Sequence, residues 1–441
     1  MSKKTARLLA MLASLALLLA ACGGGAAEEA ESASEPAAAT SEPATSEAAS
    51  PAGTEAPEAT GQGDETLTIG TALPETGSLA FLGPPEFAGA ELAVQEVNDA
   101  GGVLSGDVEL IQGDSGDTST DIANQTVDRL ISQGADVIVG AASSAVSFTF
   151  IDKVTGAGLV QFSPANTSPD FTDYEDRDLY FRTAPSDVLQ GRVLGELTLD
   201  EGCTTVGMMA LQDPYGEGLL NNASQTITDS GGEVTNEIVY DPQAQNFDSE
   251  VQQLVSSDPD CIVVIGFDES SRILSTMIEQ GLGPEEKQIY LVDGNVGNAL
   301  GEAVDASLEG VKGTLPGSVA SDEFQSRLQE IDPELQDYSY AGETYDAIVV
   351  SALAAEIAGS DEGEAIAAEI PGVTREGTKC TAFEECKQLV EDGEDIDYDG
   401  QSGPIELDDE GDPQQANFQI LIFGADNTLS VDQTKEASIG Q

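Results

Sequence analysis

The chain of 441 residues contains 81 acidic residues, 16 basic residues and no histidine, which gives a net charge of −65. Such a surface repels nucleic acid and anionic lipid headgroups, so we expect neither as a partner. The absence of histidine excludes Ser-His-Asp and Cys-His catalysis and removes the commonest ligand of zinc and haem, and no GxxxxGKS or GxxxxGKT motif is present to hold nucleotide phosphates. We therefore expect no metal and no cofactor. The length suggests two domains, and we interpret the acidity as adaptation to a salty or alkaline exterior, where ions screen the repulsion.

Residues 1–21 resemble a bacterial lipoprotein signal peptide. Lys3, Lys4 and Arg7 precede an apolar run that is short for a membrane span and that ends in the sequence LAAC at Cys22. The resemblance implies that the mature protein begins at Cys22, is lipidated there and is held outside the cytoplasmic membrane by this anchor alone. The alternative is an ordinary secretory signal in which Cys22 is incidental.

Residues 22–64 are predicted to form a disordered acidic tether. From residue 23 to residue 63 the segment contains no Val, Ile, Leu, Phe or Tyr and no basic residue. It cannot bury enough apolar area to offset the entropy cost of ordering. We therefore expect the folded part to begin near Glu65.

From there on, short apolar runs typical of buried strands alternate with segments whose apolar residues recur at helical spacing. The first series predicts strands at 67–73, 108–114, 136–141 and 159–165, with helices at 84–102, 118–135 and 143–158. The second predicts helices at 187–202, 217–232, 247–260 and 270–282, with strands at 204–211, 233–240, 261–267 and 288–294. A further helix is expected at 341–360, and a hairpin at 402–424 with its turn at Asp409-Glu410-Gly411. Two series of this kind indicate an α/β protein with two doubly wound parallel sheets.

Four cysteines follow Cys22, an even number in an exported chain. Cys380 and Cys386 are close enough in sequence to close a small loop. Cys203 and Cys261 each come just before a predicted strand, and the 2-1-3 strand order common in doubly wound sheets would make those strands neighbours. We expect the bridges Cys203–Cys261 and Cys380–Cys386; metal binding is the weaker alternative, because no CxxC pair is present.

Several stretches, in their order and spacing between residues 67 and 423, resemble the leucine/isoleucine/valine-type solute-binding proteins of ABC importers, which have the type I periplasmic-binding-protein fold. They are GSLAFLGPPEFAGAELAVQEVNDAGGV, GAASSAVS, SPANTSPDFT, YFRTAPSD, DPYGEG, ETYDAIVVSALA, VTREGTKC and DIDYDGQSGPIELDDEGD. The resemblance implies two lobes joined by three crossovers, with the ligand held between them. We place lobe 1 at residues 65–184 plus 317–397 and lobe 2 at residues 185–316 plus 398–441.

Two patches of small hydroxyl residues follow predicted strands of the first lobe, where open parallel sheets bind their ligands. Ser144 is expected to cap the following helix. By resemblance, Ser144 and Thr167 grip the ligand carboxylate, and the carbonyl of Ala165 accepts from the ligand ammonium. The alternatives are a cap alone for Ser144 and a plain strand-to-helix turn for Thr167.

Other positions match ligand-contacting places of the family. By resemblance, Tyr215 covers the ligand and Asp293 faces its ammonium; the alternatives are a turn tyrosine and a turn aspartate. The family commonly has tyrosine at two positions where this chain has Phe267 and either Leu82 or Phe81. The loss of both hydroxyl groups suggests an apolar pocket for the side chain of the ligand. Core packing is the alternative for Phe267.

The resemblance implies a monomeric, lipid-anchored receptor that captures a zwitterionic amino acid with an aliphatic or branched side chain and delivers it to an ABC permease in the membrane. No catalysis is expected. A sensory module for an amino acid, amide or small carboxylate is the first alternative. An enzyme, restricted to carboxylates and tyrosines, is the second. The solute stays open, because urea, amide and aromatic-acid binders share this scaffold.

Overall fold

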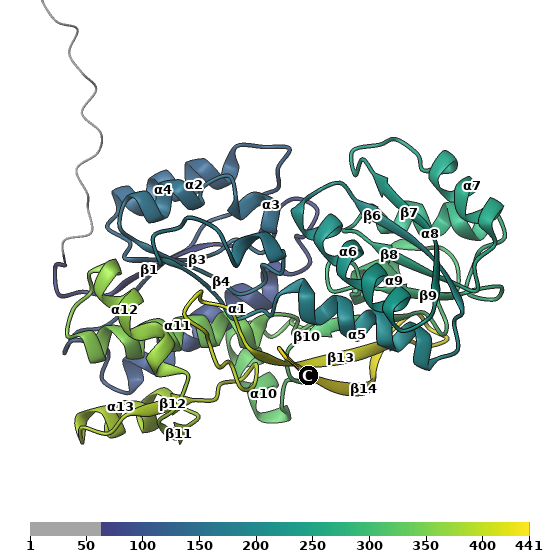
Figure 1. Cartoon of the computed structure of the whole chain (residues 1–441). Coiled ribbons are helices and arrows are strands. Elements are labelled where there is room, and N and C mark those ends of the chain that lie inside the picture. The colour runs from purple at the N-terminus through teal and green to yellow at the C-terminus, as the bar shows by residue number, and fades with distance from the viewer. Residues whose placement is uncertain (1–62, 441) are drawn as a thin grey trace, which may run out of the picture. The chain divides into compact units, whose positions relative to one another are not determined.

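The computed structural model describes residues 63–440, so the predicted signal peptide, Cys22 and nearly all of the tether lie outside the described residues. Its first sheet has five parallel strands in the order β2-β1-β3-β4-β5 (Figure 1). The strands are β1 (Thr68–Ala72), β2 (Glu109–Ile111), β3 (Val137–Gly140), β4 (Val160–Ser163) and β5 (Tyr180–Arg182).

Helices cover both faces of this sheet. In β3, Val137 and Val139 pack with α1 and α11, whereas Ile138 points to the other face and packs with α2 and α4. The helices around this sheet are α1 (Gly83–Asp99), α2 (Ile122–Ser132), α3 (Ser144–Ser147), α4 (Ile151–Gly156), the short η1 (Pro169–Phe171), α10 (Asp322–Ile331), α11 (Ala341–Ala358), α12 (Gly363–Val373) and α13 (Phe383–Glu391). Beside α13, β11 (Thr378–Cys380) and β12 (Ile396–Tyr398) form a small parallel pair.

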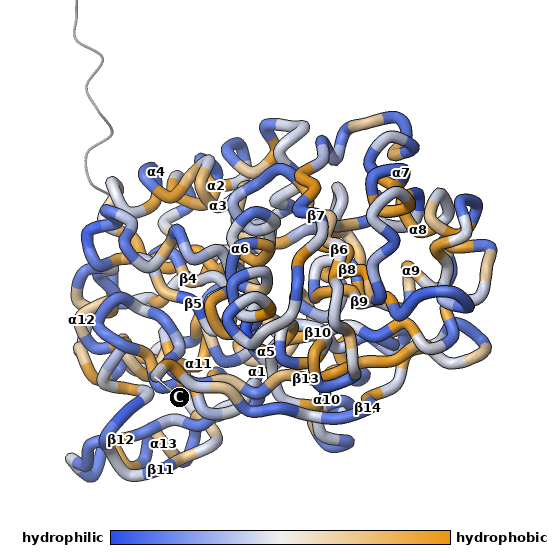
Figure 2. The backbone as a smooth tube through the Cα atoms, turned by 45° about the vertical axis from the view of Figure 1, so that its right-hand side comes forward, coloured by the Kyte–Doolittle hydropathy of each residue, from blue (hydrophilic) through white to orange (hydrophobic). Residues whose placement is uncertain are grey.

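The second sheet has seven strands in the order β14-β13-β10-β9-β8-β6-β7. Strands β6 to β10 are parallel, whereas β13 is antiparallel to both β10 and β14. Figure 2 shows hydrophobic residues concentrated along the central strands β6 and β8. The strands are β6 (Thr205–Leu211), β7 (Glu233–Tyr240), β8 (Cys261–Ile265), β9 (Gln288–Leu291), β10 (Lys312–Pro316), β13 (Gln415–Phe423) and β14 (Leu429–Ser438). The helices of this part are α5 (Asp187–Asp200), α6 (Pro214–Asp229), α7 (Asp248–Ser257), α8 (Ser270–Glu279) and α9 (Asn298–Ala303).

The chain passes between the two sheets after β5, after β10 and after β12, and the start of α11 binds all three crossing segments. The Thr183 hydroxyl donates to the carbonyl oxygen of Glu343 (2.9 Å). Gly317 lies directly against the carboxyl group of Glu343, because a Cβ atom at position 317 would be 1.9 Å from its Oε1. Asp346 Oδ2 accepts from the backbone N–H of Ser402 (2.7 Å). This end of α11 therefore ties together the three segments that connect the sheets.

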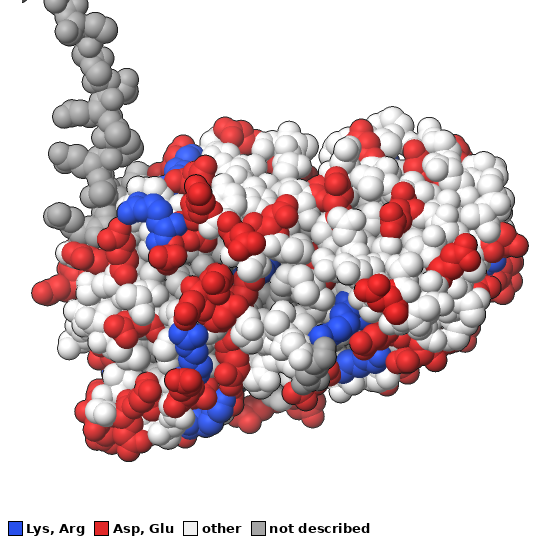
Figure 3. All heavy atoms as spheres, in the orientation of Figure 1, with Lys and Arg blue, Asp and Glu red and all other residues white. Residues whose placement is uncertain are grey.

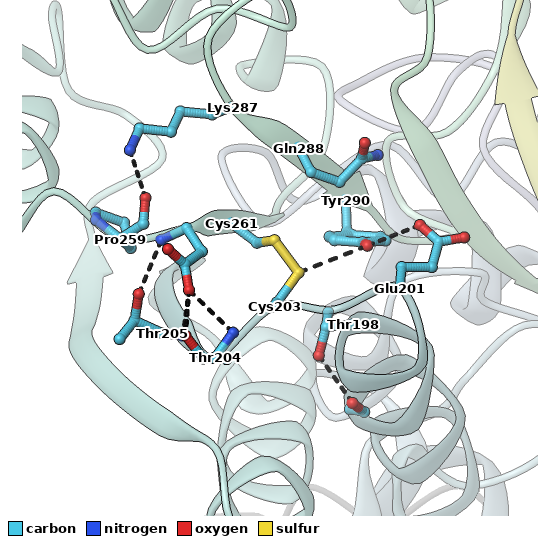
Figure 4. The surroundings of a disulfide bond; sticks show 12 residues. Thr198, Glu201, Cys203, Thr204, Thr205, Pro259, Cys261, Lys287, Gln288 and Tyr290 are labelled. Carbon is cyan, nitrogen blue, oxygen red and sulfur yellow. Dashed lines mark hydrogen bonds between the residues drawn. A yellow bond between two sulfur atoms is a disulfide. The ribbon is translucent and has the colours of Figure 1, made fainter.

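Both expected disulfides form. Cys203 and Cys261 lie at the starts of β6 and β8, which are neighbours in the sheet as predicted, and their Cα atoms are 5.8 Å apart. The Tyr290 hydroxyl lies 3.7 Å from Cys203 Sγ (Figure 4). Cys380 and Cys386 join β11 to α13 with a Cα separation of 5.4 Å.

Two predicted elements differ from the structure. The helix expected at 143–158 is divided into α3 and α4, and the Thr149 hydroxyl binds the Val146 carbonyl (2.7 Å) at the break. The hairpin expected at 402–424 forms only in part: Leu407 and Pro413 make a single antiparallel bridge around the expected turn, whereas β13 pairs with the later segment 429–438. Between residues 63 and 440, no helix is both long and apolar enough to cross a bilayer.

Candidate ligand-binding cleft

Loops at the carboxyl ends of strands from both sheets enclose a small cavity, here called the inner pocket. Segments after β1, β3 and β4 form one wall, and segments after β6, β8 and β9 form the other. Its cavity volume is about 10 Å³, which is room for a single water molecule. The lining residues are Leu79, Leu82, Ala142, Ser143, Ser144, Ala165, Tyr215, Phe267, Asp293, Gly294 and Tyr340.

The structure brings most of the predicted site residues to this pocket, namely Leu82, Ser144, Ala165, Tyr215, Phe267 and Asp293. Two others lie elsewhere. Phe81 lines an adjoining chamber, and Thr167 is fully buried but lines neither cavity.

Asp293 is the most heavily hydrogen-bonded side chain of the inner pocket, and it is only 4% exposed. Its Oδ1 accepts from the Tyr215 hydroxyl (2.7 Å) and from Gln190 Nε2 (2.8 Å), and its Oδ2 accepts from the Tyr340 hydroxyl (2.6 Å). Burial raises the pKa of Asp293, and these hydrogen bonds oppose that rise. All three donors are neutral, so they stabilise the carboxylate without cancelling its charge.

The first turn of α5 adds further buried polar groups beside Asp293. Asp187 is fully buried, and neither of its carboxyl oxygens has a hydrogen-bond partner among the described residues; the same is true of Gln190 Oε1 and Thr167 Oγ1. The Asp187 N–H donates to the Thr167 carbonyl (2.7 Å), which ties the two segments together. Burial, with repulsion from Asp293 as the second cause, raises the pKa of Asp187 well above its usual range. Buried polar groups without a protein partner are rare in proteins.

Ser144 lines the inner pocket, but it is not the helix cap that we expected. Ser143 occupies the cap position, and its hydroxyl accepts from the N–H of Val146 (3.4 Å). Ser144 is the first residue of α3, and its hydroxyl accepts from the N–H of Ser168 (3.3 Å). The extended backbone before the helix ends one residue earlier than predicted, which moves the cap to Ser143 and turns Ser144 towards the second hydroxyl patch.

A larger apolar cavity, here called the outer chamber, adjoins the inner pocket and has a volume of about 200 Å³. Phe267 lines both cavities, and its ring stacks on Tyr215 with centroids 5.6 Å apart. Phe81 lies against Gly297 across the cleft, because a Cβ atom at position 297 would be 3.1 Å from the Phe81 ring. The other lining residues are Gly77, Ser78, Ala80, Asp268, Ser271, Asn295, Ala299, Leu300 and Ala303.

Sequence reasoning missed Tyr340, Gln190 and Asp187. Tyr340 follows a segment for which no element was predicted, and its left-handed backbone (φ 61°) carries no local sequence signal. Gln190 and Asp187 were assigned only to a predicted helix. Their spacing of three residues places them on one face of that helix, and this spacing is the sequence signal that could have predicted two polar side chains at the same site.

Comparisons with known proteins agree with this architecture. The family model described as "Periplasmic binding protein" matches residues 66–391, well over half of the chain. The leucine-, isoleucine-, valine-, threonine- and alanine-binding protein of Pseudomonas aeruginosa is 25% identical over 377 residues, which cover 82% of this chain and 91% of the relative.

Two solved structures show the same fold. The branched-chain amino acid transporter substrate binding protein LivJ from Streptococcus pneumoniae, in complex with isoleucine, aligns with a TM-score of 0.69 at 20% identity over 85% of this chain and 99% of that one. An ABC-transporter solute-binding protein from R. palustris, in complex with benzoate, aligns with a TM-score of 0.64 at 19% identity over 83% and 98%. Together with the family match, the two-sheet fold and the cleft between the sheets establish that the chain belongs to the periplasmic binding protein family.

Proposed function

We propose that the chain is the extracytoplasmic receptor of an ABC importer, anchored through a lipid on Cys22, and that it captures an amino acid with a branched aliphatic side chain. The observation that carries this proposal is the cleft itself. Asp293 is a buried carboxylate whose hydrogen-bond donors are all neutral, and it lines the inner pocket together with Ser143 and Ser144. The apolar outer chamber adjoins this pocket.

The inner pocket would hold the head group of the amino acid. The ammonium would meet Asp293 and the carbonyl oxygen of Ala165, and the carboxylate would meet Ser144, with Thr167 reached when the walls rearrange. Charge-assisted hydrogen bonds of this kind are the strong ones, and in a water-poor cleft an unmatched charge is expensive. The inner pocket therefore favours a ligand that carries both an ammonium and a carboxylate group.

The outer chamber would hold the side chain. Its walls are mostly Ala, Leu, Gly and Phe, and about 200 Å³ exceeds the roughly 150 Å³ cavity that suffices for benzene. A branched aliphatic side chain fits this volume and finds no charged partner except Asp268 at the wall. The names of the relatives from Pseudomonas aeruginosa and Streptococcus pneumoniae point to the same class of ligand.

Entry of the ligand requires the lobes to separate, because about 10 Å³ cannot admit an amino acid. We propose the lobe boundaries 65–184 plus 317–397 and 185–316 plus 398–441, with the hinge at the start of α11. Closure on a ligand that contacts both lobes is a population shift, so neither lobe alone would bind well. The closed monomer would then be recognised by the permease.

The second candidate ligand is an aromatic carboxylate, because one structural neighbour holds benzoate. Asp293 and the net charge of −65 both repel an anion that has no ammonium group. A thermal-shift screen tests the proposal, because a ligand that binds only the folded state raises the melting temperature. L-leucine, L-isoleucine and L-valine should raise it more than benzoate or acetamide. A rise with benzoate alone would assign the protein to the organic-acid binders.

A further inference from the structure

The loop that carries Thr167 is fixed through its backbone carbonyl groups. The Asn166 carbonyl accepts a hydrogen bond from Arg182 Nη1 (3.3 Å), and the Ser168 carbonyl accepts from the same nitrogen (2.7 Å). The carbonyl of Thr167 accepts from the N–H of Asp187 (2.7 Å). All three carbonyl groups from residue 166 to residue 168 are therefore bound by donors of the protein itself.

These contacts set the direction of the N–H groups of the loop, because the C=O and the following N–H of a trans peptide point in opposite directions. The Ser168 N–H, opposite the Thr167 carbonyl, donates to the hydroxyl of Ser144, which lines the inner pocket. The Thr167 N–H, opposite the Asn166 carbonyl, points away from Arg182 and has no acceptor among residues 63–440. The loop thus keeps one unused N–H donor next to the contact with Ser144.

Arg182 is fully buried in β5, and all five of its N–H groups donate hydrogen bonds. Nε and Nη2 bind the two carboxylate oxygens of Asp412 (2.6 and 2.7 Å), and Nη2 also donates to Thr172 Oγ1 (3.2 Å). With the two loop carbonyls at Nη1, these contacts use every donor that a guanidinium group has. The bidentate ion pair with Asp412 therefore holds the guanidinium in the orientation that directs Nη1 at the loop.

Stability alone does not account for this buried ion pair. Loss of hydration offsets much of the attraction between two buried charges, so an apolar pair of similar volume would stabilise the fold as well. An apolar side chain at position 182 could not, however, bind the carbonyls of Asn166 and Ser168. What Arg182 adds is the orientation of the loop.

We propose that Arg182 is a positioning residue for the carboxylate of the ligand: by holding the Asn166 and Ser168 carbonyls, it directs the Thr167 N–H at that carboxylate. Arg182 itself does not touch the ligand. The step to the ligand rests on the proposed function, whereas the hold on the loop does not. Arg182→Lys separates charge from geometry, because lysine keeps the positive charge but has three donors on one nitrogen for the two Asp412 oxygens and the two carbonyls.

The hold on the loop is tested without any ligand, by NMR. The sequence contains two Asn-Thr pairs, Asn166-Thr167 and Asn427-Thr428, so a chain labelled with ¹³C at the asparagine carbonyls and with ¹⁵N in threonine gives two carbonyl-to-amide signals. Arg182→Lys should shift the Asn166-Thr167 signal, because the peptide group loses a charge-assisted hydrogen bond at its carbonyl. The Asn427-Thr428 signal should stay in place.

Arg177→Lys is the matched control. Arg177 also binds a carbonyl, that of Thr155 (2.8 Å), and a carboxylate, that of Glu364 (2.7 Å), but none of its hydrogen bonds reaches residues 165–168. This variant should leave both signals unchanged. If Arg182→Lys does not fold, Thr172→Val takes its place, since it removes one contact of Nη2 and keeps the ion pair; a smaller shift is then expected. An unchanged Asn166-Thr167 signal in the folded variant would overturn the hold on the loop.

The step to the ligand is tested on the same labelled chain with L-leucine. The ligand should move the amide proton of Thr167 downfield in the parent chain, because the N–H then donates to a carboxylate, and this movement should be smaller in Arg182→Lys. Calorimetry should show L-leucine bound about tenfold more weakly by Arg182→Lys and equally well by Arg177→Lys. A Thr167 amide proton that does not respond to L-leucine, or an unchanged affinity in Arg182→Lys, would overturn this step. If the parent chain binds no amino acid, the proposed function fails, and the spectra without ligand still decide whether Arg182 holds the loop.

Discussion

Burial raises the pKa of several carboxyl groups at the cleft and the hinge. They are Asp187, Asp293, Glu86 and Glu343. Glu86 is fully buried in α1, and neither carboxyl oxygen has a hydrogen-bond partner among the described residues; repulsion from Glu343 adds to its raised pKa. Burial favours the neutral form of Asp187, Glu86 and Glu343, because an unpaired buried charge is very costly, whereas the three hydrogen bonds to Asp293 stabilise its carboxylate.

Glu343 therefore makes the stability of the protein depend on pH. Burial raises its pKa from 4.5 to about 8, so above pH 4.5 the folded protein keeps a proton that the unfolded chain releases. Its contribution to stability is complete below pH 4.5 and is lost as the pH rises towards 8. Between about pH 5 and pH 8, the melting temperature of the wild type should fall by several degrees more than that of Glu343→Gln, which is always neutral.

The control for this experiment is Glu330→Gln, on the exposed face of α10, which should follow the wild type at every pH. Parallel pH profiles of the wild type and Glu343→Gln would show that Glu343 does not carry the proton.

At the scale of elements, the sequence predicted the alternation of strands and helices well, because it depends on local apolar spacing. Strands such as β6 and β8 are continuous apolar runs, and the cysteines before them predicted a disulfide that forms. The two failures differ in kind. At the break between α3 and α4 the Thr149 hydroxyl binds the Val146 carbonyl, which is a local contact, whereas β13 takes its partner from the later segment 429–438 and not from the nearer run.

The residues of the candidate site were likewise predictable only where they follow a local sequence pattern. Ser144, Ala165 and Asp293 follow predictable strands and meet in the inner pocket, whereas Tyr340 reaches it from a segment without a local pattern. Nothing near Tyr340 in sequence indicates that its hydroxyl meets Asp293, because that contact exists only when the two sheets face each other.

At the proposed hinge, a glycine substitution separates the cost of backbone strain from the cost of lost packing. Gly317 has φ +95° and faces the Glu343 carboxyl, whereas Gly310 has φ +87° and faces open space. Gly310→Ala should cost only the backbone strain of a left-handed residue, about 1 kcal/mol, and Gly317→Ala should cost clearly more, since its methyl group must also displace Glu343. Urea denaturation of both variants measures the difference. Equal losses of unfolding free energy would mean that Glu343 does not pack on the crossing segment.

At the scale of the whole molecule, the net charge affects which ligands can approach the cleft. Figure 3 shows acidic side chains spread over the visible face, with few basic ones between them. A net charge of −65 repels anions at long range, whereas a zwitterion feels little net force and can be held by local contacts at both ends. The overall field therefore favours the same class of ligand as the inner pocket.

The anchor is tested by Cys22→Ala, at a position outside the described residues. If Cys22 carries the lipid, the variant should be released into the medium or remain unprocessed, because the chain then has no acyl group to hold it at the membrane. Fractionation followed by mass spectrometry of the N-terminus measures this. Mature Cys22→Ala that stays with the membrane would contradict the lipoprotein signal.

The central claim is that Asp293 receives the ammonium of an amino acid, and calorimetry with two ligands tests it most directly. L-leucine and 4-methylpentanoate differ only in the ammonium group, so Asp293→Asn should weaken L-leucine at least about tenfold and should not weaken 4-methylpentanoate, whose repulsion by Asp293 it removes. Asp268→Asn, in the wall of the outer chamber, is the control and should affect both ligands equally. Equal losses for the two ligands in Asp293→Asn, or a wild type that prefers 4-methylpentanoate, would contradict the account.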